Sequence, residues 1–93
     1  MGQLLRTAGI PATGTFAVQI ASFSREENAR RLVAELGRRL GGATIQEATV
    51  NGARFFRVQA GRYGSLRQAD EARGRLASSG FPGGVVVALE EQR

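Results

Sequence analysis

Two segments of this chain have nearly the same sequence, and this duplication constrains the fold more than any other feature. Phe16–Phe23 reads FAVQIASF and Phe56–Tyr63 reads FRVQAGRY, at an offset of 40 residues. The match continues downstream in two pairs of apolar residues, Ala29 with Ala69 and Leu36 with Leu76. Two copies are too few for a solenoid, so we predict one small domain with pseudo-twofold symmetry.

Four segments are predicted to be strands. Residues 16–23 and 53–61 alternate between two sets of side chains with the period of a strand, and residues 85–89 are β-branched and apolar. Residues 43–50 form the second strand, although their pattern does not show which side is apolar. Asn51-Gly52 predicts a two-residue hairpin between the second and third strands, because a type I′ turn needs positive φ at both positions.

Two amphipathic helices are predicted between these strands. In each, a serine is followed three residues later by Glu or Gln, which is the spacing of a capping box: Ser24 with Glu27, and Ser65 with Gln68. Apolar residues then recur at helical spacing, and Gly41-Gly42 is expected to end the first helix.

The resulting order, β-α-β-β-α-β, is twice the unit β-α-β. Right-handed crossovers with both helices on one face lead to an α+β, ferredoxin-like (split βαβ) sandwich with a four-stranded antiparallel sheet. We expect the domain to cover residues 16–90, with residues 1–15 as a linker or tail and residues 91–93 as a short tail. The first and third strands are then central neighbours, and the sheet face away from the helices is left open.

The residues that point away from the core on the central strands form this open face. The expected members are Ala17, Gln19 and Ala21 from the first strand and Phe55, Arg57 and Gln59 from the third, with Ser22 and Arg62 at the strand ends. An aromatic platform beside amides and a guanidinium suits a sugar, because the ring can pack on Phe55 while the polar groups donate to oxygens. Either amide taken alone is more typical of an ordinary solvated face.

The composition excludes several kinds of site. The chain has no cysteine and no histidine, so it lacks thiolate ligands, imidazole ligands and the usual general base. Its serines have no His or Lys to activate them, and no glycine motif has the spacing of a phosphate-binding loop. We therefore expect no enzyme activity, no catalytic residue, no metal site and no cofactor.

The net charge of +5, with arginine as the only basic residue, permits a nucleic acid, an anionic membrane or an acidic polysaccharide as partner. Helical arginines are also typical of a solvated face. An RNA-recognition module has the same order of elements, and RFFRVQAG at 54–61 resembles its aromatic strand motif, but the first strand offers Gln19 between alanines. A nucleic-acid-binding domain is therefore the alternative hypothesis. A protein-interaction surface at Arg30 and Arg31 is a third.

At VQIASF (18–23) and FRVQAGRY (56–63), the sequence resembles the SPOR (sporulation-related repeat) domain family, over about residues 15–90. The resemblance implies binding of peptidoglycan glycan strands that lack stem peptides, through the open sheet face, in bacterial cell-division and cell-wall remodelling proteins. By position, the family's binding residues correspond to Gln19, Ser22, Phe55 and Arg57; we add Gln59 from its place on the open face.

The chain departs from the family's common pattern at three positions. Tryptophan is frequent near Phe55, glycine at Ala21 and proline at Arg62. We predict a non-catalytic peptidoglycan-binding module of the periplasm and division septum, acting as a monomer. For this fragment we expect no nucleic-acid partner and no membrane contact.

Overall fold

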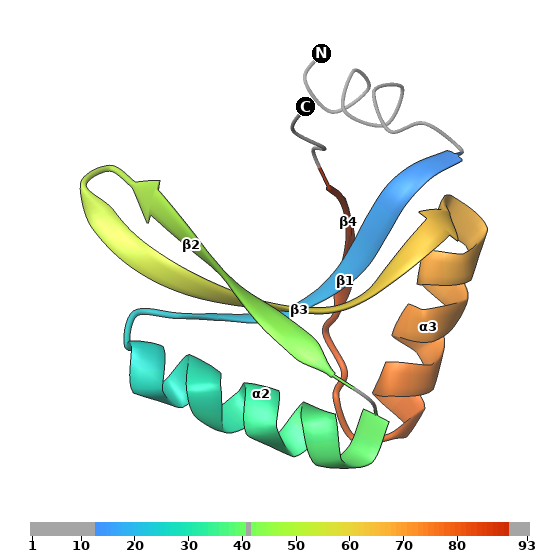
Figure 1. Ribbon diagram of the computed structural model, residues 1–93, viewed down its shortest axis with the longest axis horizontal. Helices are drawn as coiled ribbons and strands as arrows, with labels where there is room; N and C mark the ends of the chain where they lie inside the picture. The colour runs from blue at the N-terminus through green and yellow to red at the C-terminus, as the bar shows by residue number, and fades with distance from the viewer. Residues whose placement is uncertain (1–12, 41, 90–93) are drawn as a thin grey trace.

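The computed structural model describes residues 13–40 and 42–89. Figure 1 shows their elements in the order β1 (Thr13–Phe23), α2 (Glu26–Leu40), β2 (Ala43–Val50), β3 (Ala53–Ser65), α3 (Leu66–Ser78) and β4 (Val85–Ala88). The predicted β-α-β-β-α-β order is confirmed. Two strands are longer than expected, because β1 begins three residues before Phe16 and β3 continues from Gly61 to Ser65.

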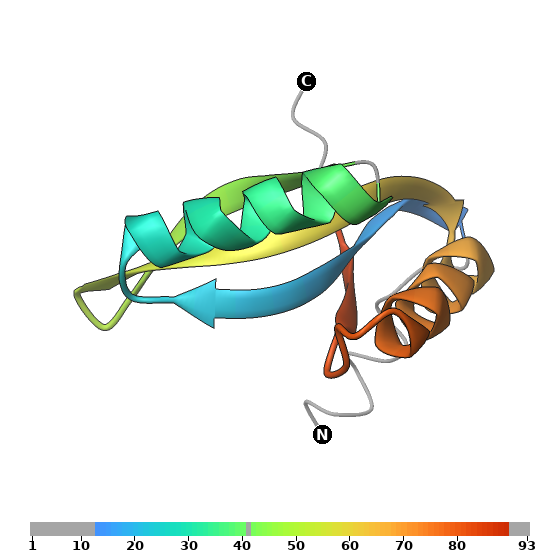
Figure 2. The same ribbon diagram turned by 90° about the horizontal axis from the view of Figure 1, so that it is seen from below.

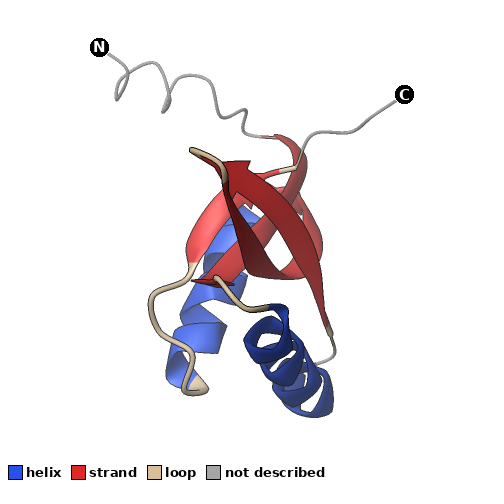
Figure 3. Ribbon diagram, turned by 90° about the vertical axis from the view of Figure 1, so that its left-hand side faces the viewer, coloured by secondary structure: helices blue, strands red, loops and turns tan. Residues whose placement is uncertain are grey.

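The four strands form one antiparallel sheet in the order β2-β3-β1-β4, so β1 and β3 are the central pair, as predicted. Both helices lie on one side of this sheet, and the other side carries no helix (Figures 2 and 3). α2 packs under β1, β2 and β3, whereas α3 packs under β1, β3 and β4. The ferredoxin-like sandwich is therefore confirmed. Neither helix in the described part of the chain is long and apolar enough to cross a membrane.

The core is built twice from equivalent residues of the two repeats. The fully or nearly fully buried pairs are Phe16 with Phe56, Val18 with Val58, Ala29 with Ala69, and Leu36 with Leu76. Burial of apolar side chains contributes roughly 25 cal/mol per Å². The similarity of the two segments therefore has a simple cause, since both supply the same inward-facing side chains to one core.

The hairpin and the second helix cap follow the sequence signals. Asn51 and Gly52 both have positive φ, 51° and 83°, as the type I′ turn requires. The Oγ of Ser65 accepts a hydrogen bond from the backbone N–H of Gln68 at 3.2 Å. The Gln68 side chain reaches back one residue further than predicted, because its Oε1 accepts from the N–H of Gly64.

The predicted cap of the first helix is wrong. α2 begins at Glu26, and the carbonyl oxygen of Arg25 accepts the first hydrogen bonds of the helix, from the N–H groups of Asn28 and Ala29. Arg25 therefore holds the cap position, and Ser24 lies one residue too early. The carboxylate of Glu27 accepts from Arg25 at 3.1 Å instead of joining a capping box.

One irregularity in β1 changes which of its side chains reach the open face. Gln19 pairs with Gln59, but Ala21 pairs with Val58, so Ile20 is an extra residue, a β-bulge. Strict alternation predicted Ala21 on the open face; this is wrong, because residues directly opposite each other share a face and Val58 is buried in the core. The next residue, Ser22, pairs with Arg57 and lies on the open face.

The contribution of the core to stability can be tested by substitution. Replacing Leu36, which is fully buried, by alanine should lower the free energy of unfolding by about 2–5 kcal/mol, through lost burial and the cavity left behind. That is a large part of the roughly 5–15 kcal/mol expected for a small domain. The control Val50→Ala, at an exposed hairpin position, should cost at most about 1 kcal/mol. Urea unfolding measures both, and equal losses would contradict this account of the core.

Candidate functional site

The candidate site is the sheet side away from the helices, which we call the open face. Figure 3 shows this side as the upper surface of the sheet, with both helices below it. Of the five predicted residues, Gln19 and Ser22 lie on β1 and Phe55, Arg57 and Gln59 lie on β3. Three residues of β2 that the sequence analysis did not place also lie on the open face, because each is directly opposite a predicted residue. The pairs are Thr44 with Gln59, Gln46 with Arg57, and Ala48 with Phe55.

The centre of the open face is a pair of equivalent glutamines. Gln19 and Gln59 occupy the same position in the two repeats, and they are direct neighbours across the β1–β3 pair. The Nε2 of Gln59 donates a hydrogen bond to the Oε1 of Gln19 at 3.3 Å. The pseudo-twofold axis therefore passes between them. This bond uses one N–H of Gln59 and one lone pair of Gln19, and the two amides have further donors and lone pairs besides.

A second row crosses the open face one step away. Ser22, Arg57 and Gln46 follow one another across β1, β3 and β2. They offer a hydroxyl, a guanidinium and an amide, which together can donate to and accept from a polar ligand. The β1 bulge creates this row, because without it Ser22 would point to the helix side.

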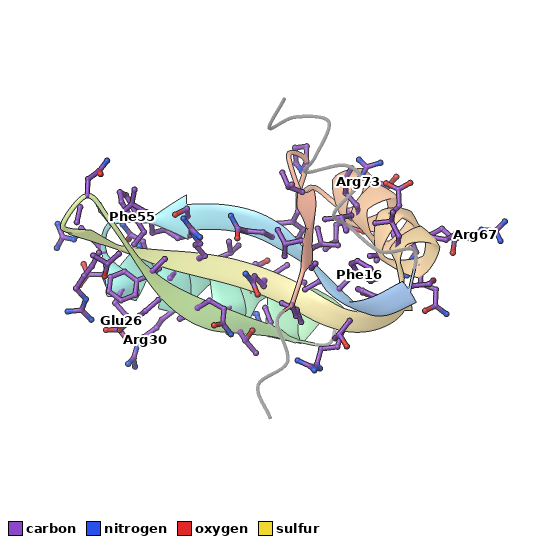
Figure 4. All side chains as sticks on the ribbon, turned by 90° about the horizontal axis from the view of Figure 1, so that it is seen from above. Phe16, Glu26, Arg30, Phe55, Arg67 and Arg73 are labelled. Carbon is purple, nitrogen blue, oxygen red and sulfur yellow. The ribbon has the colours of Figure 1, made fainter. Side chains whose placement is uncertain are left out.

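Phe55 lies nearer the hairpin than the other predicted residues. Figure 4, which looks onto the open face, shows it at the hairpin end of the sheet and Phe16 toward the other end. Its side chain is half-buried, and its cross-strand neighbour Ala48 is small. A planar ring beside a small residue provides an apolar platform adjacent to the polar row of Arg57.

The open face is hollowed along β2 and β3, and the hollow extends to the end of β4. A hollow of about 590 Å³ is lined by Gln46, Glu47, Ala48, Arg57, Gln59, Arg62, Ala88 and Leu89. An adjoining hollow of about 520 Å³ shares Gln46, Gln59 and Arg62. Both volumes are within the range of small-molecule sites. Two predicted residues, Arg57 and Gln59, therefore line the larger hollow, whereas Gln19, Ser22 and Phe55 do not.

The second bulge, in β3, determines where Arg62 lies. Phe16 pairs with Tyr63 and Val18 with Ala60, so Gly61 and Arg62 together lie opposite Ala17. Arg62 consequently reaches the open face, and Tyr63 packs against the core. Ala17 was expected to be part of the exposed surface, but it is 1% exposed and pairs with Val87 of β4, so it offers no contact area.

Most arginines in the described part of the chain pair locally with acidic residues. The pairs are Arg25–Glu27, Arg30–Glu26, Arg38–Glu35, Arg54–Glu47, Arg67–Glu71 and Arg73–Asp70. All are solvent-exposed, so each contributes little to stability. Figure 4 shows Arg67 and Arg73 projecting from α3, away from Phe55. Arg57 differs, because no carboxylate pairs with it among residues 13–40 and 42–89.

Comparison with known proteins identifies the fold and the family. The family model described as the SPOR domain matches residues 12–88. The chain is similar to the crystal structure of the RlpA SPOR domain from Pseudomonas aeruginosa, with 21% identity and a TM-score of 0.67, over 82% of this chain and 100% of that chain. It is also similar to the solution structure of the peptidoglycan binding domain of the B. subtilis cell wall lytic enzyme CwlC, with 25% identity and a TM-score of 0.62, over 86% of this chain and 95% of that chain. No curated protein matches it.

Because of the bulge in β3, we expect alanine substitutions at two glycines to change the stability of the domain in opposite directions. Gly61 has φ +75°, and a Cβ there would overlap the Tyr63 ring, so Gly61→Ala should lower the free energy of unfolding by about 2 kcal/mol or more. Gly74, inside α3, has nothing within 4 Å of the position that a Cβ would take, so Gly74→Ala should raise it by about 0.5–1 kcal/mol. Urea unfolding of both variants checks this, and a neutral Gly61→Ala would contradict the bulge.

Proposed function

The chain belongs to the SPOR domain family, and from this premise we propose that it is a non-catalytic module that binds peptidoglycan. The ligand is a glycan strand that lacks stem peptides, and binding it brings the parent protein to the division septum, in the periplasm of the bacterial envelope. The observation that carries the proposal is the open face, where a glutamine pair adjoins Arg57, a cation without a described carboxylate partner. The similar CwlC domain, described as peptidoglycan-binding, supports it.

The open face suggests a role for each binding residue. Gln19, Gln59 and Ser22 hydrogen-bond the hydroxyl and N-acetyl groups of the sugars, since amides and hydroxyls both donate and accept. Phe55 packs against a sugar face. Gln46, which the sequence did not single out, lies opposite Arg57 and lines the hollow, so it joins the same set.

Arg57 makes the module bind stripped strands, which are glycan strands without stem peptides, more tightly than strands that carry stem peptides. Where the stem peptide is absent, the lactyl group of the glycan ends in a free carboxylate, and a guanidinium binds a carboxylate with charge-assisted hydrogen bonds. Such bonds contribute about 1.5–3 kcal/mol when well made. Where a stem peptide is present, the same carbon is an amide with no charge, and the peptide crowds the hollow. The free energy of binding therefore favours the stripped strand.

We expect no catalysis at the open face. The open face holds amides, a hydroxyl, arginines and an aromatic ring, and none of these is paired with a group that would activate it as a nucleophile or base. The module therefore supplies affinity and location, and acts as a monomer, while any bond cleavage belongs to other parts of its parent protein.

Retention on isolated cell walls tests this function. Sacculi treated with an amidase, which removes stem peptides, should retain more of the module than intact sacculi. Arg57→Gln should lower the affinity for treated sacculi by about 10- to 100-fold, because it removes the binding free energy of one charge-assisted contact. The control Arg67→Gln removes the same charge from α3, where Arg67 lies 3.8 Å from Glu71, and should bind like the original chain.

Three results would count against the proposal in different ways. Equal retention on intact and treated sacculi would remove the preference for stripped strands. Equal losses in the two arginine variants would show that net charge, and not the open face, drives binding. Tight, strongly salt-dependent binding to single-stranded RNA with no retention on sacculi would favour the nucleic-acid alternative.

A further inference from the structure

The helix side of the molecule has a hollow of its own, of about 470 Å³, where β1 ends beside α2. It is lined by Phe23 of β1 and by residues of α2 between Asn28 and Arg38, and we call it the α2 hollow. Figure 2 shows α3 toward the other end of β1. The α2 hollow is therefore separate from the open face, because the sheet lies between them.

The apolar part of the α2 hollow consists of Phe23 and Leu32. Both side chains are half-buried and pack against the core, so the core holds each of them in place while part of it stays exposed. Ala34 is small and exposed, and it also lines the hollow. A large apolar side chain of another molecule can therefore pack against a fixed apolar wall without any rearrangement of the core.

The charged side chains that line the α2 hollow are Arg31, Glu35 and Arg38. Glu35 pairs with Arg38. The Nη1 of Arg31 donates to the neutral side chain of Asn28, at 3.2 Å from its Oδ1. This bond uses one of the five N–H groups of the guanidinium, and no carboxylate pairs with Arg31 among residues 13–40 and 42–89. Arg31 thus has a charge without a described counter-charge, next to an apolar wall.

The preceding residue, Arg30, is placed differently. Its Nε and Nη2 both donate to the Oε2 of Glu26, at 3.1 and 2.8 Å, and Figure 4 shows these two side chains close together. Arg30 does not line the α2 hollow. The sequence suggests Arg30 and Arg31 as one candidate surface for a protein partner, whereas the structure separates them and leaves Arg31 as the residue suited to this role.

We propose that the α2 hollow binds a segment of a partner protein in which an Asp or Glu lies beside a large apolar side chain. The apolar side chain packs against Phe23 and Leu32, and the carboxylate accepts charge-assisted hydrogen bonds from Arg31. A helical segment suits the hollow, because residues three or four apart share one face of a helix. This interaction goes beyond the proposed glycan binding, and both ligands can be bound at once because they use opposite sides of the sheet.

An anionic lipid surface fits the α2 hollow less well than a protein segment. Attraction to such a surface depends on several exposed cations that act together. Here Arg30 and Arg38 are paired with Glu26 and Glu35, so of these three arginines only Arg31 has no described carboxylate partner. A hollow with an apolar wall and one such cation favours a specific contact with one carboxylate and one apolar side chain.

Selection from a display library of random short peptides tests the proposal. Peptides enriched on the original chain should carry Asp or Glu three or four positions from Leu, Ile or Phe. Arg31→Gln should weaken their binding by about fivefold or more, because it removes the charge that the carboxylate contacts. The matched control Arg30→Gln removes the same charge from the neighbouring residue and should bind these peptides like the original chain. Ala34→Glu should also weaken binding, because its carboxylate lies three residues from Arg31 and competes for it.

Two further measurements separate a local contact from a change of fold or of glycan binding. Titration with an enriched peptide should shift the backbone amide signals of Phe23, Arg31 and Leu32. Arg31→Gln and Ala34→Glu should keep the circular dichroism spectrum of the original chain and its retention on amidase-treated sacculi, because both residues line the α2 hollow and not the open face.

The proposal is overturned if selection yields no peptide whose binding depends on Arg31, or if Arg30→Gln and Arg31→Gln lose the same amount. Binding to vesicles that contain phosphatidylglycerol, weakened equally in these two variants, would indicate a lipid surface and would also overturn it. These results leave glycan binding untouched. Conversely, a chain that binds the peptides but is not retained on treated sacculi would overturn the proposed function and support the α2 hollow.

Discussion

The antiparallel pairing of β1 with β3 is the contact on which the rest of the structure depends. It joins the two repeats, places their apolar residues on one side over both helices, and brings Gln19 directly opposite Gln59. A single pairing thereby fixes the core and the centre of the open face together. Because residues directly opposite each other share a face, the register of this one pair decides which side chains are available to a ligand.

The sequence was sufficient for the fold because the fold depends on features that sequence patterns express directly. The duplication predicts the two β-α-β units, and Asn51-Gly52 predicts the hairpin. The helical spacing of the apolar residues around Leu36 and Leu76 predicts which helix faces are buried. Each of these is a local signal with a physical cause. α2 starts one residue later than its capping signal predicts, because Ser24 and Arg25 are adjacent and such a signal does not distinguish positions one residue apart.

The open face was harder to predict because it depends on register. Strict alternation put Ala21 outward, and the bulge at Ile20 turns it inward and Ser22 outward. No residue pattern in β1 marks this bulge, whereas in β3 the glycine at 61 is such a sign, since its φ of +75° disfavours other residues. The side on which Gln46 lies is hard to predict for a different reason: β2 does not alternate regularly in polarity, so only the pairing with Arg57 shows that Gln46 is on the open face.

The two repeats are equivalent in the core but not at the edges of the sheet, and this explains why the open face is asymmetric. The repeat relates Arg57 to Ala17. Arg57 faces Gln46 of β2, a strand paired along its whole length with β3, whereas Ala17 faces Val87 of β4, a strand of four residues, and is fully buried there. An arginine at position 17 would have to be desolvated, so that half of the site can hold only a small residue. At this position the open face therefore carries a cation on β3 and a buried alanine on β1, so its two halves are chemically different.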